Sequence, residues 1–519
     1  MELSIRTADV VTILIYLLVM IAAGFYFARR NRTTEDYFVG NRSFAGWVIG
    51  LSMLGTIVSS ATFLALPAAA YILDWRQLTV NLVLPFIAVL AVVVFIPFFR
   101  RGKLTSAFEY LGQRYGFIPR MYGTVSFIIL QLIRMAQILF LVSLVIQFLT
   151  GISIVWVIVA IGLFIGFYTF MGGIEAVIWT DVIQALILIV GGVVCIYWVS
   201  ADLPGGFSQI FEVGQAHNKF SLGSMDFDLG KRTFYTVAIL GIINWLGIFA
   251  GDQNMVQRYV SARSTREAQK ATIIYSMIAL PMWILFFLVG TGLFVFYLLN
   301  PDPVVSGLDA DQVLPYFIFT EIPPVITGII ISAVIAASMS TMDSGINAIS
   351  TVAVIDFMKP WLAKGREDSY YFRSAHLIVG VVTFLVIAGA ISFSLMEKES
   401  MNDISLIVTS VFGGCLMGLF LMGFFTERID GYAATVALIV AVLVNIYLGL
   451  GLLGILPPSL TLMIHSYWVI ALVNGTFIIL AYIIGAIRGR NSKSLEGLTV
   501  WTIKRGSGSG DRGNTLKSK

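Results

Sequence analysis

Long apolar runs recur along the chain, separated by short polar segments. A run of about 20 apolar residues is long enough to cross the ~30 Å hydrocarbon core of a bilayer as a helix. The pattern predicts an all-α polytopic membrane protein with about thirteen spans, at 8–28, 45–71, 79–99, 121–149, 152–171, 178–201, 233–256, 271–299, 324–356, 374–395, 403–425, 431–451 and 465–487. The first run is too long for the core of a cleavable signal peptide, so we expect it to remain as a helix.

Basic residues predict the direction of insertion. With the amino terminus outside, 26 of the 33 Lys and Arg residues fall on the cytoplasmic side and six on the outside. Cytoplasmic loops carry this excess in membrane proteins. We therefore expect a multi-pass protein of the plasma (inner) membrane, with the amino terminus outside and the carboxyl terminus in the cytoplasm. The one remaining basic residue, Arg134, lies in the middle of the fourth span.

Composition excludes several classes of function. The chain is 58% hydrophobic and 12% charged, roughly half the charged fraction of a soluble protein. Its three histidines are isolated, and neither metal-ligand spacing nor a Ser/His/Asp arrangement favours a membrane enzyme. The net charge of +4 reflects the loop asymmetry, so no nucleic-acid partner is expected. The partners that we expect are the lipid bilayer and a small solute, with the monomer as the functional unit.

Two spans differ from continuous helices. They contain LSMLGTIVSSATFLALPAAAY (51–71) and ILGIINWLGIFAGDQNMVQRY (239–259). The first has Gly55, Ser59, Ser60, Thr62 and Pro67, and the second has Gly241, Gly247 and Gly251 around Asn244 and Trp245. Interrupted spans in corresponding places of two halves indicate a transporter binding site near the bilayer midplane. These are the second and seventh spans, as two inverted five-helix repeats require. The alternative is that Gly and Pro are simply common in membrane helices.

The ninth span carries an oxygen-rich face. It contains ISAVIAASMSTMDSGINA (331–348), in which Ala337, Ser340, Thr341 and Ser344 share one helical face with Asp343 on its flank. A carboxylate at membrane depth costs a few kcal/mol, so it indicates a functional contact. A second intramembrane carboxylate is Asp181 in the sixth span. Hydroxyls and carboxylates favour a monovalent-cation site; the alternatives are hydroxyl bonds to the i−4 carbonyl, above all for Ser338, and a structural polar cluster.

Arg134 is the other costly residue within the membrane. Its guanidinium group could hold a substrate carboxylate through two parallel hydrogen bonds. It could equally pair with a protein carboxylate such as Asp181. Gln137, about one turn along the same helix, could share its face.

Five motifs together resemble the sodium:solute symporter family over about residues 8–487. They are EDYFVGNRS (35–43), TSAFEYLGQRYG (105–116), MGGIEAVIWTDVIQ (171–184), DQNMVQRYVSARSTREAQKA (252–271) and SMSTMDSGINA (338–348). The resemblance implies a LeuT-like inverted five-helix repeat with one leading and two trailing helices. The expected segments are a leading helix and loop (1–44), two repeats (45–201 and 233–425) around an extracellular loop (202–232), two trailing helices (426–487) and a cytoplasmic tail (488–519).

The resemblance implies symport driven by Na⁺ through alternating access. It places the main Na⁺ site at the carbonyls of Gly55, Val58 and Ala337 and the hydroxyls of Ser340 and Thr341. A second Na⁺ site, seen in the sialic-acid branch, implies Asp181, Ser340, Asp343 and Ser344 as ligands. That branch often has serine where Asp343 stands, so the acid strengthens the site or changes its ion. A non-transporting sensor with this fold is the rival class, and the short tail after residue 487 argues against it.

Substrate motifs resemble two branches of the family. The segment SSATF (59–63) and Arg134 look like the bacterial sialic-acid transporters, which implies substrate contacts from Ser59, Thr62 and Arg134, with Asn81 where that branch has a glutamine. Ser60 and Gln137 are further candidates for the substrate site. Trp245 stands where sugar and sialic-acid carriers place an asparagine, as in the monocarboxylate, iodide and vitamin branch, and Asn244 could compensate. We expect an organic anion, with sialic acid as the leading candidate and a neutral sugar, monocarboxylate or vitamin as the alternative.

Overall fold

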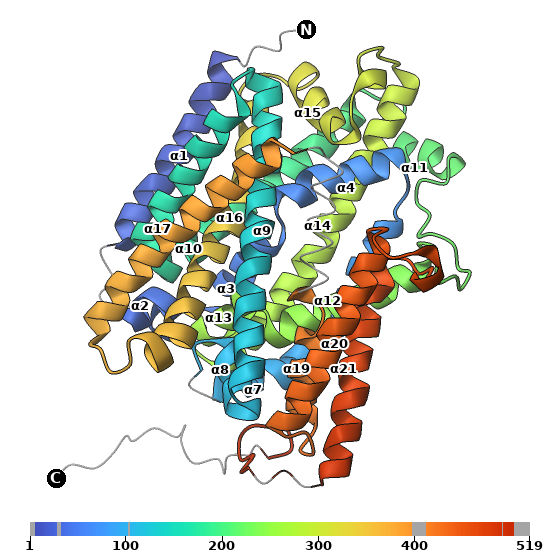
Figure 1. Ribbon diagram of the computed structural model, residues 1–519. Coiled ribbons are helices and arrows are strands. Elements are labelled where there is room, and N and C mark those ends of the chain that lie inside the picture. Colours follow the sequence, from blue (N-terminus) through green and yellow to red (C-terminus); the bar gives the residue numbers. More distant parts are fainter. Residues whose placement is uncertain are drawn as a thin grey trace, which may run out of the picture.

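The computed structural model describes residues 6–28, 33–101, 104–396, 412–489, 491 and 493–502. These residues form a bundle of helices that run mostly along one axis (Figure 1). The helices that carry the argument are α1 (Thr7–Ala28), α3 (Gly46–Ile57), α4 (Ser60–Ile72), α5 (Thr79–Leu82), α8 (Ala107–Tyr115), α9 (Phe117–Thr150), α10 (Ile154–Ala201), α12 (Phe234–Gly251), α13 (Gln253–Ser261), α14 (Thr265–Leu299), α15 (Ala310–Thr320), α16 (Ile326–Val352), η5 (Ala353–Leu362) and α17 (Asp368–Ser394).

Within these described ranges, ten helices are long and apolar enough to cross a membrane, or eleven when α3 and α4 count as one span. The 48-residue α10 contains two of the predicted spans and bends at Gly173, whose φ of +54° a residue with a Cβ rarely adopts. The predicted span 403–425 lies partly outside the described residues, and only its end appears as α19 (Leu416–Phe425). The segment 202–232 contains a short helix, α11 (Gly206–Ala216).

The break in the second span is confirmed. Helices α3 and α4 meet at an angle of 57°. Val58 and Ser59 between them are extended, with ψ angles of 100° and 176°. Pro67 lies within α4 and does not interrupt it. Two residues outside regular helix therefore lie in the middle of the bundle.

The seventh span is broken at a different residue from the one expected. Helix α12 runs without interruption through Asn244 and Trp245, so the predicted unwinding around them is wrong. The break falls at Asp252, whose backbone is extended and whose side chain caps α13 by accepting a hydrogen bond from the Asn254 amide at 2.8 Å. The glycines serve close packing instead: a Cβ on Gly241 would lie 2.5 Å from the Val80 carbonyl oxygen.

Helix α16 forms the centre of the bundle. Nearly every residue from Thr327 to Val352 is buried, and α16 packs against α1, α3, α9, α10 and α17. Its hydroxyls and carboxylate therefore face protein on all sides. In a medium without water such groups must find partners inside the bundle.

We predict that Gly290→Ala destabilises the protein. Helix α14 passes so close to α4 that a Cβ on Gly290 would lie 2.2 Å from the Pro67 carbonyl oxygen, and backbone cannot move aside as a side chain can. Such overpacking typically costs about 1–3 kcal/mol. Gly380→Ala on α17 is the matched control, because nothing lies within 4 Å of its Cβ position. Thermal unfolding of the purified variants should show a lower midpoint for Gly290→Ala only; equal midpoints would contradict the close approach.

Candidate functional site

The break between α3 and α4 meets the hydroxyl face of α16. Ser340 Oγ donates to the Gly55 carbonyl at 2.6 Å, and Thr341 Oγ1 donates to the Thr56 carbonyl at 3.2 Å. Both hydroxyls also lie within 3.4 Å of the Ala337 carbonyl oxygen. Four of the five residues expected at the main Na⁺ site, Gly55, Ala337, Ser340 and Thr341, are thus brought together by the fold.

Val58, the fifth residue, lies at the break itself. It is completely buried, and its amide donates to the Leu54 carbonyl at 2.9 Å. Its own carbonyl accepts no hydrogen bond from any described residue. A buried carbonyl without a partner among the described residues, next to two hydroxyls and the Gly55 and Ala337 carbonyls, is the kind of oxygen cluster that a hard cation prefers.

Ser338 behaves differently from its neighbours on α16. Its hydroxyl donates to the Val334 carbonyl four residues earlier, at 3.1 Å, and has no other bond among the described residues. The structural interpretation is therefore correct for Ser338. It also makes Ser338 a natural control for Ser340, because the two serines are equally buried on the same helix.

A buried ion pair lies about one turn further along the same face of α3, beside Ser52. Arg258 on α13 donates from one guanidinium nitrogen to Asp181 Oδ2 and Ser344 Oγ, both at 2.7 Å. Its Nε donates to Ser52 Oγ at 2.9 Å, and Ser52 donates in turn to Asp181 at 2.6 Å. Arg258 and Asp181 are at most 1% exposed. One guanidinium group thus joins α3, α10, α13 and α16.

This pair corrects two expectations. Asp181 pairs with Arg258 and not with Arg134. Arg258 follows the predicted seventh span (233–256) and was therefore expected in a cytoplasmic loop, but it is fully buried. Removing one partner of a buried ion pair costs about 3–5 kcal/mol because the other charge stays buried. The motif DQNMVQRY contained the signal, since a buried carboxylate requires a cation and Arg258 stands in it.

Asp343 lies next to this network. Its Oδ2 accepts a hydrogen bond from the Tyr168 hydroxyl on α10, and it interacts electrostatically with Asp181 and Arg258. Asp343 Oδ1 and Asp181 Oδ1 are both buried, and neither has a hydrogen-bond partner among the described residues. Ser344 Oγ lies 3.0 Å from Thr56 Oγ1. Two carboxylate oxygens in the dry interior are therefore left for a ligand that the protein itself does not supply.

The residues expected to bind substrate come from four helices. Ser59 and Ser60 are buried at the start of α4, and Ser60 Oγ has no hydrogen-bond partner. Thr62 on α4, Asn81 on α5 and Gln137 on α9 are half-buried. On α12, Asn244 is exposed, whereas Trp245 is 3% exposed and donates its indole N–H to the Val80 carbonyl at 3.0 Å.

Arg134 on α9 is half-buried. No hydrogen bond or ion pair from the described part of the chain reaches its guanidinium group; its electrostatic neighbours are Asp252 and Tyr275. An arginine inside a membrane protein that lacks a close partner faces a cavity or a ligand. The guanidinium group of Arg134 is therefore available to donate hydrogen bonds to a ligand.

The two ends of the bundle carry different contacts. At the end of the bundle where α8 lies, Arg120 on α9 pairs with buried Asp356 on η5 at 2.7 Å. Near it, Gln253 accepts a hydrogen bond from the Ala107 amide at 2.8 Å and donates one to the Thr105 carbonyl at 3.0 Å. At the end of α15, a cavity of about 450 Å³ is lined by α4, α9 and α15. The α8 end also holds a cavity, of about 850 Å³, which Arg100, Thr105 and Ile355 help to line. Both ends are therefore hollowed, and at the α8 end buried polar contacts join the helices beside the cavity.

Comparison with known proteins decides the family. The sodium:solute symporter family matches residues 37–441. The chain belongs to this family. It is 34% identical over 429 residues to the sodium/sialic acid symporter SiaT of Proteus mirabilis (strain HI4320), covering 82% of this chain and 86% of the relative. It is also 30% identical over 449 residues to the human sodium/iodide cotransporter, covering 83% and 67%.

A solved structure supports the same assignment. The substrate-bound outward-open state of a Na⁺-coupled sialic acid symporter matches with a TM-score of 0.85 and 30% identity, over 93% of this chain and 99% of that one. This match confirms the LeuT-like fold class. The protein is a multi-pass membrane transporter that couples solute movement to Na⁺, and it is not an enzyme.

Proposed function

We propose that this sodium:solute symporter imports an organic anion across the plasma membrane, with sialic acid as the leading candidate. The observation that carries the proposal is Arg134, a half-buried intramembrane arginine without a close protein partner in the described chain. A guanidinium fork matches a carboxylate in charge and geometry. The similar symporters named for sialic acid support this substrate.

The substrate site that we propose lies between α4 and α9. Ser59, Ser60 and Thr62 begin α4, so its free amide groups and hydroxyls join Arg134 in attracting an anion. Gln137, Asn81 and Asn244 supply further polar contacts in this proposal. Trp245 shapes the wall rather than bonding to the substrate, because its one donor is used by Val80.

An anion of the monocarboxylate or vitamin type is the second candidate. Trp245 favours it, since this large buried ring, packed against Phe249, Tyr275 and Trp283, offers an apolar wall where sugar carriers have a polar side chain. A neutral sugar is less favoured because it would leave the Arg134 charge uncompensated.

We propose that Na⁺ binds first, at the carbonyls of Gly55, Val58 and Ala337 and the hydroxyls of Ser340 and Thr341. Both hydroxyls already point at the carbonyls released by the break. A bound Na⁺ would replace these two hydrogen bonds and hold α3 against α16. Each charge that enters down a 100 mV potential contributes about 2.3 kcal/mol to accumulation of the solute.

A second Na⁺ site is proposed at Asp181, Ser340, Asp343 and Ser344. The two carboxylate oxygens without partners, Asp181 Oδ1 and Asp343 Oδ1, support it. Arg258 already satisfies Asp181 Oδ2, so the ion would bind toward Asp343. With an acid in place of a neutral hydroxyl, this site gains attraction for a cation.

We propose that the transporter works by alternating access between the two ends of the bundle. With the amino terminus outside and the carboxyl terminus in the cytoplasm, the cavity beside α15 faces outward, and the Arg120–Asp356 pair joins α9 to η5 on the cytoplasmic side. The two proposed repeats, 45–201 and 233–425, supply the elements on either side. Na⁺ orders the site, substrate binding permits closure, and the coupling is reciprocal, so that substrate tightens Na⁺ binding in turn.

We predict that Ser340→Ala raises the Na⁺ concentration for half-maximal uptake about tenfold, the equivalent of about 1.4 kcal/mol, because one ligand is lost. Ser338→Ala is the matched control, since its hydroxyl bonds only to its own helix. Uptake into proteoliposomes measured against Na⁺ concentration distinguishes them. Equal Na⁺ dependence in both variants would remove the sodium assignment.

We predict that Arg134→Ala weakens the binding of organic anions at least tenfold, because a hydrogen bond between charged groups contributes about 1.5–3 kcal/mol. Calorimetry with sialic acid and short carboxylates in Na⁺ measures this loss. Stabilisation of the same variant by Na⁺ alone should persist. Unchanged affinity for every anion would show that the substrate does not bind through its charge.

A further inference from the structure

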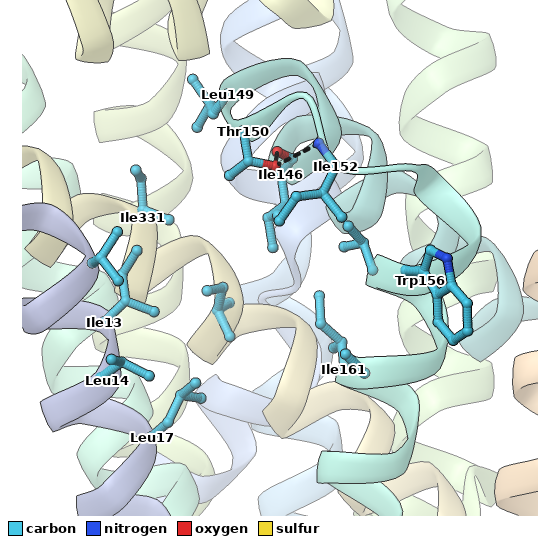
Figure 2. Close-up of a pocket in the computed structure, with 14 residues that line it drawn as sticks. Ile13, Leu14, Leu17, Ile146, Leu149, Thr150, Ile152, Trp156, Ile161 and Ile331 are labelled. Carbon is cyan, nitrogen blue, oxygen red and sulfur yellow. Dashed lines mark hydrogen bonds between the residues drawn. The ribbon is translucent and has the colours of Figure 1, made fainter. Parts of the chain in front are cut away.

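An apolar pocket of about 570 Å³ opens on the side of the bundle, away from the transport site. It is surrounded by α1, α9, α10 and α16 (Figure 2). Ile13, Leu14 and Leu17 form one wall and face Ile161 and Trp156 across the space. The volume lies within the range of small-molecule sites, ~300–1,000 Å³.

The pocket offers its occupant no hydrogen bond in its interior. The lining is aliphatic apart from Thr150 and Trp156. Thr150 Oγ1 donates to the Ile146 carbonyl at 2.6 Å and accepts from the Ile152 amide at 3.2 Å, so it is already satisfied. The site therefore selects for an apolar chain.

The rim of the pocket lies on the surface that faces lipid. Leu14, Ile152 and Trp156 are 51%, 51% and 70% exposed, and apolar side chains so exposed on the side of a membrane-spanning bundle are suited to contact lipid. Ile152 and Trp156 lie where α9 gives way to α10, at the end of the bundle. Tryptophan at such a position is typical of the membrane–water interface. A chain that enters here would come from a lipid whose headgroup lies at that level.

The inner end of the pocket reaches the core. Ile331 and Ile335 on α16 are each only 5% exposed, and Ile335 precedes Ser340 by five residues on the same helix. Together with Ile146 and Leu149 they also border a narrow gap that continues to Leu64 on α4 and Pro315 on α15. An occupant would thus lie between helices and not merely along their outer surface.

We propose that this pocket is a specific binding site for one acyl chain of a membrane phospholipid. A chain surrounded by four helices gains van der Waals contacts on all sides, whereas a chain in the lipid annulus contacts protein on one side only. The bound chain would replace an apolar void beside α16 and hold this helix in place. The proposal does not depend on the identity of the transported solute.

Filling the pocket tests the proposal. Ala160→Trp and Leu17→Trp project an indole ring into it from α10 and α1, while Leu377→Trp places the same ring on α17, where Leu377 is 70% exposed and lines no pocket identified in the described chain. Native mass spectrometry of the full chain during graded detergent delipidation counts the phospholipids that remain bound.

We expect wild type and Leu377→Trp to retain a phospholipid after the annular lipids have gone, and both pocket variants to lose it. Adding phospholipid back should raise the unfolding midpoint of delipidated wild type but not of Ala160→Trp. Equal lipid retention in wild type and the pocket variants, or no retained lipid in wild type, would overturn the proposal. If a pocket variant fails to fold, the add-back measurement on wild type and Leu377→Trp still decides, because absence of a shift contradicts it.

Discussion

The structure depends on one constraint: a helix that stops in the middle of a membrane protein must place its free backbone carbonyls against something other than lipid. Here Val58 and Ser59 separate α3 from α4, and the hydroxyls of Ser340 and Thr341 on α16 meet the carbonyls of Gly55 and Thr56. Such hydroxyl–carbonyl contacts are each modest in net free energy, about 0.5–1.5 kcal/mol. They can therefore be exchanged for a cation without unfolding the bundle, which is what a coupling site requires.

The Arg258–Asp181 pair fixes the helices around the proposed Na⁺ site. It joins four helices through buried hydrogen bonds, and it cannot be exchanged cheaply because each charge would remain in a dry interior. The exchangeable contacts at Ser340 and Thr341 thus lie beside a fixed framework. The same framework leaves one oxygen of Asp181 and one of Asp343 without partners, and this is where an added positive charge gains most.

Sequence periodicity was sufficient for the helical class and for the break in the second span, because apolar length and the cluster of Ser59, Ser60 and Thr62 are local signals. It was insufficient for the second break. Glycines at 241 and 251 looked like helix breakers but serve close packing against Val80 and Phe420. The sequence could not show which buried arginine pairs with Asp181, because Arg258 and Asp181 lie 77 residues apart. Only the fold shows that Arg258 is the partner of Asp181 and that Arg134 has no close partner in the described chain.

The central claim is that Na⁺ bridges the break between α3 and α4 to α16. Hydrogen exchange of the purified protein in Na⁺ and in an equal concentration of K⁺ tests it most directly, because amides near the break open only when α3 separates from α16. The account predicts slower exchange in Na⁺ than in K⁺ for peptides spanning 55–62 and 337–344, with the Gly380 region of α17 unchanged. Identical exchange of both segments in the two salts would contradict it.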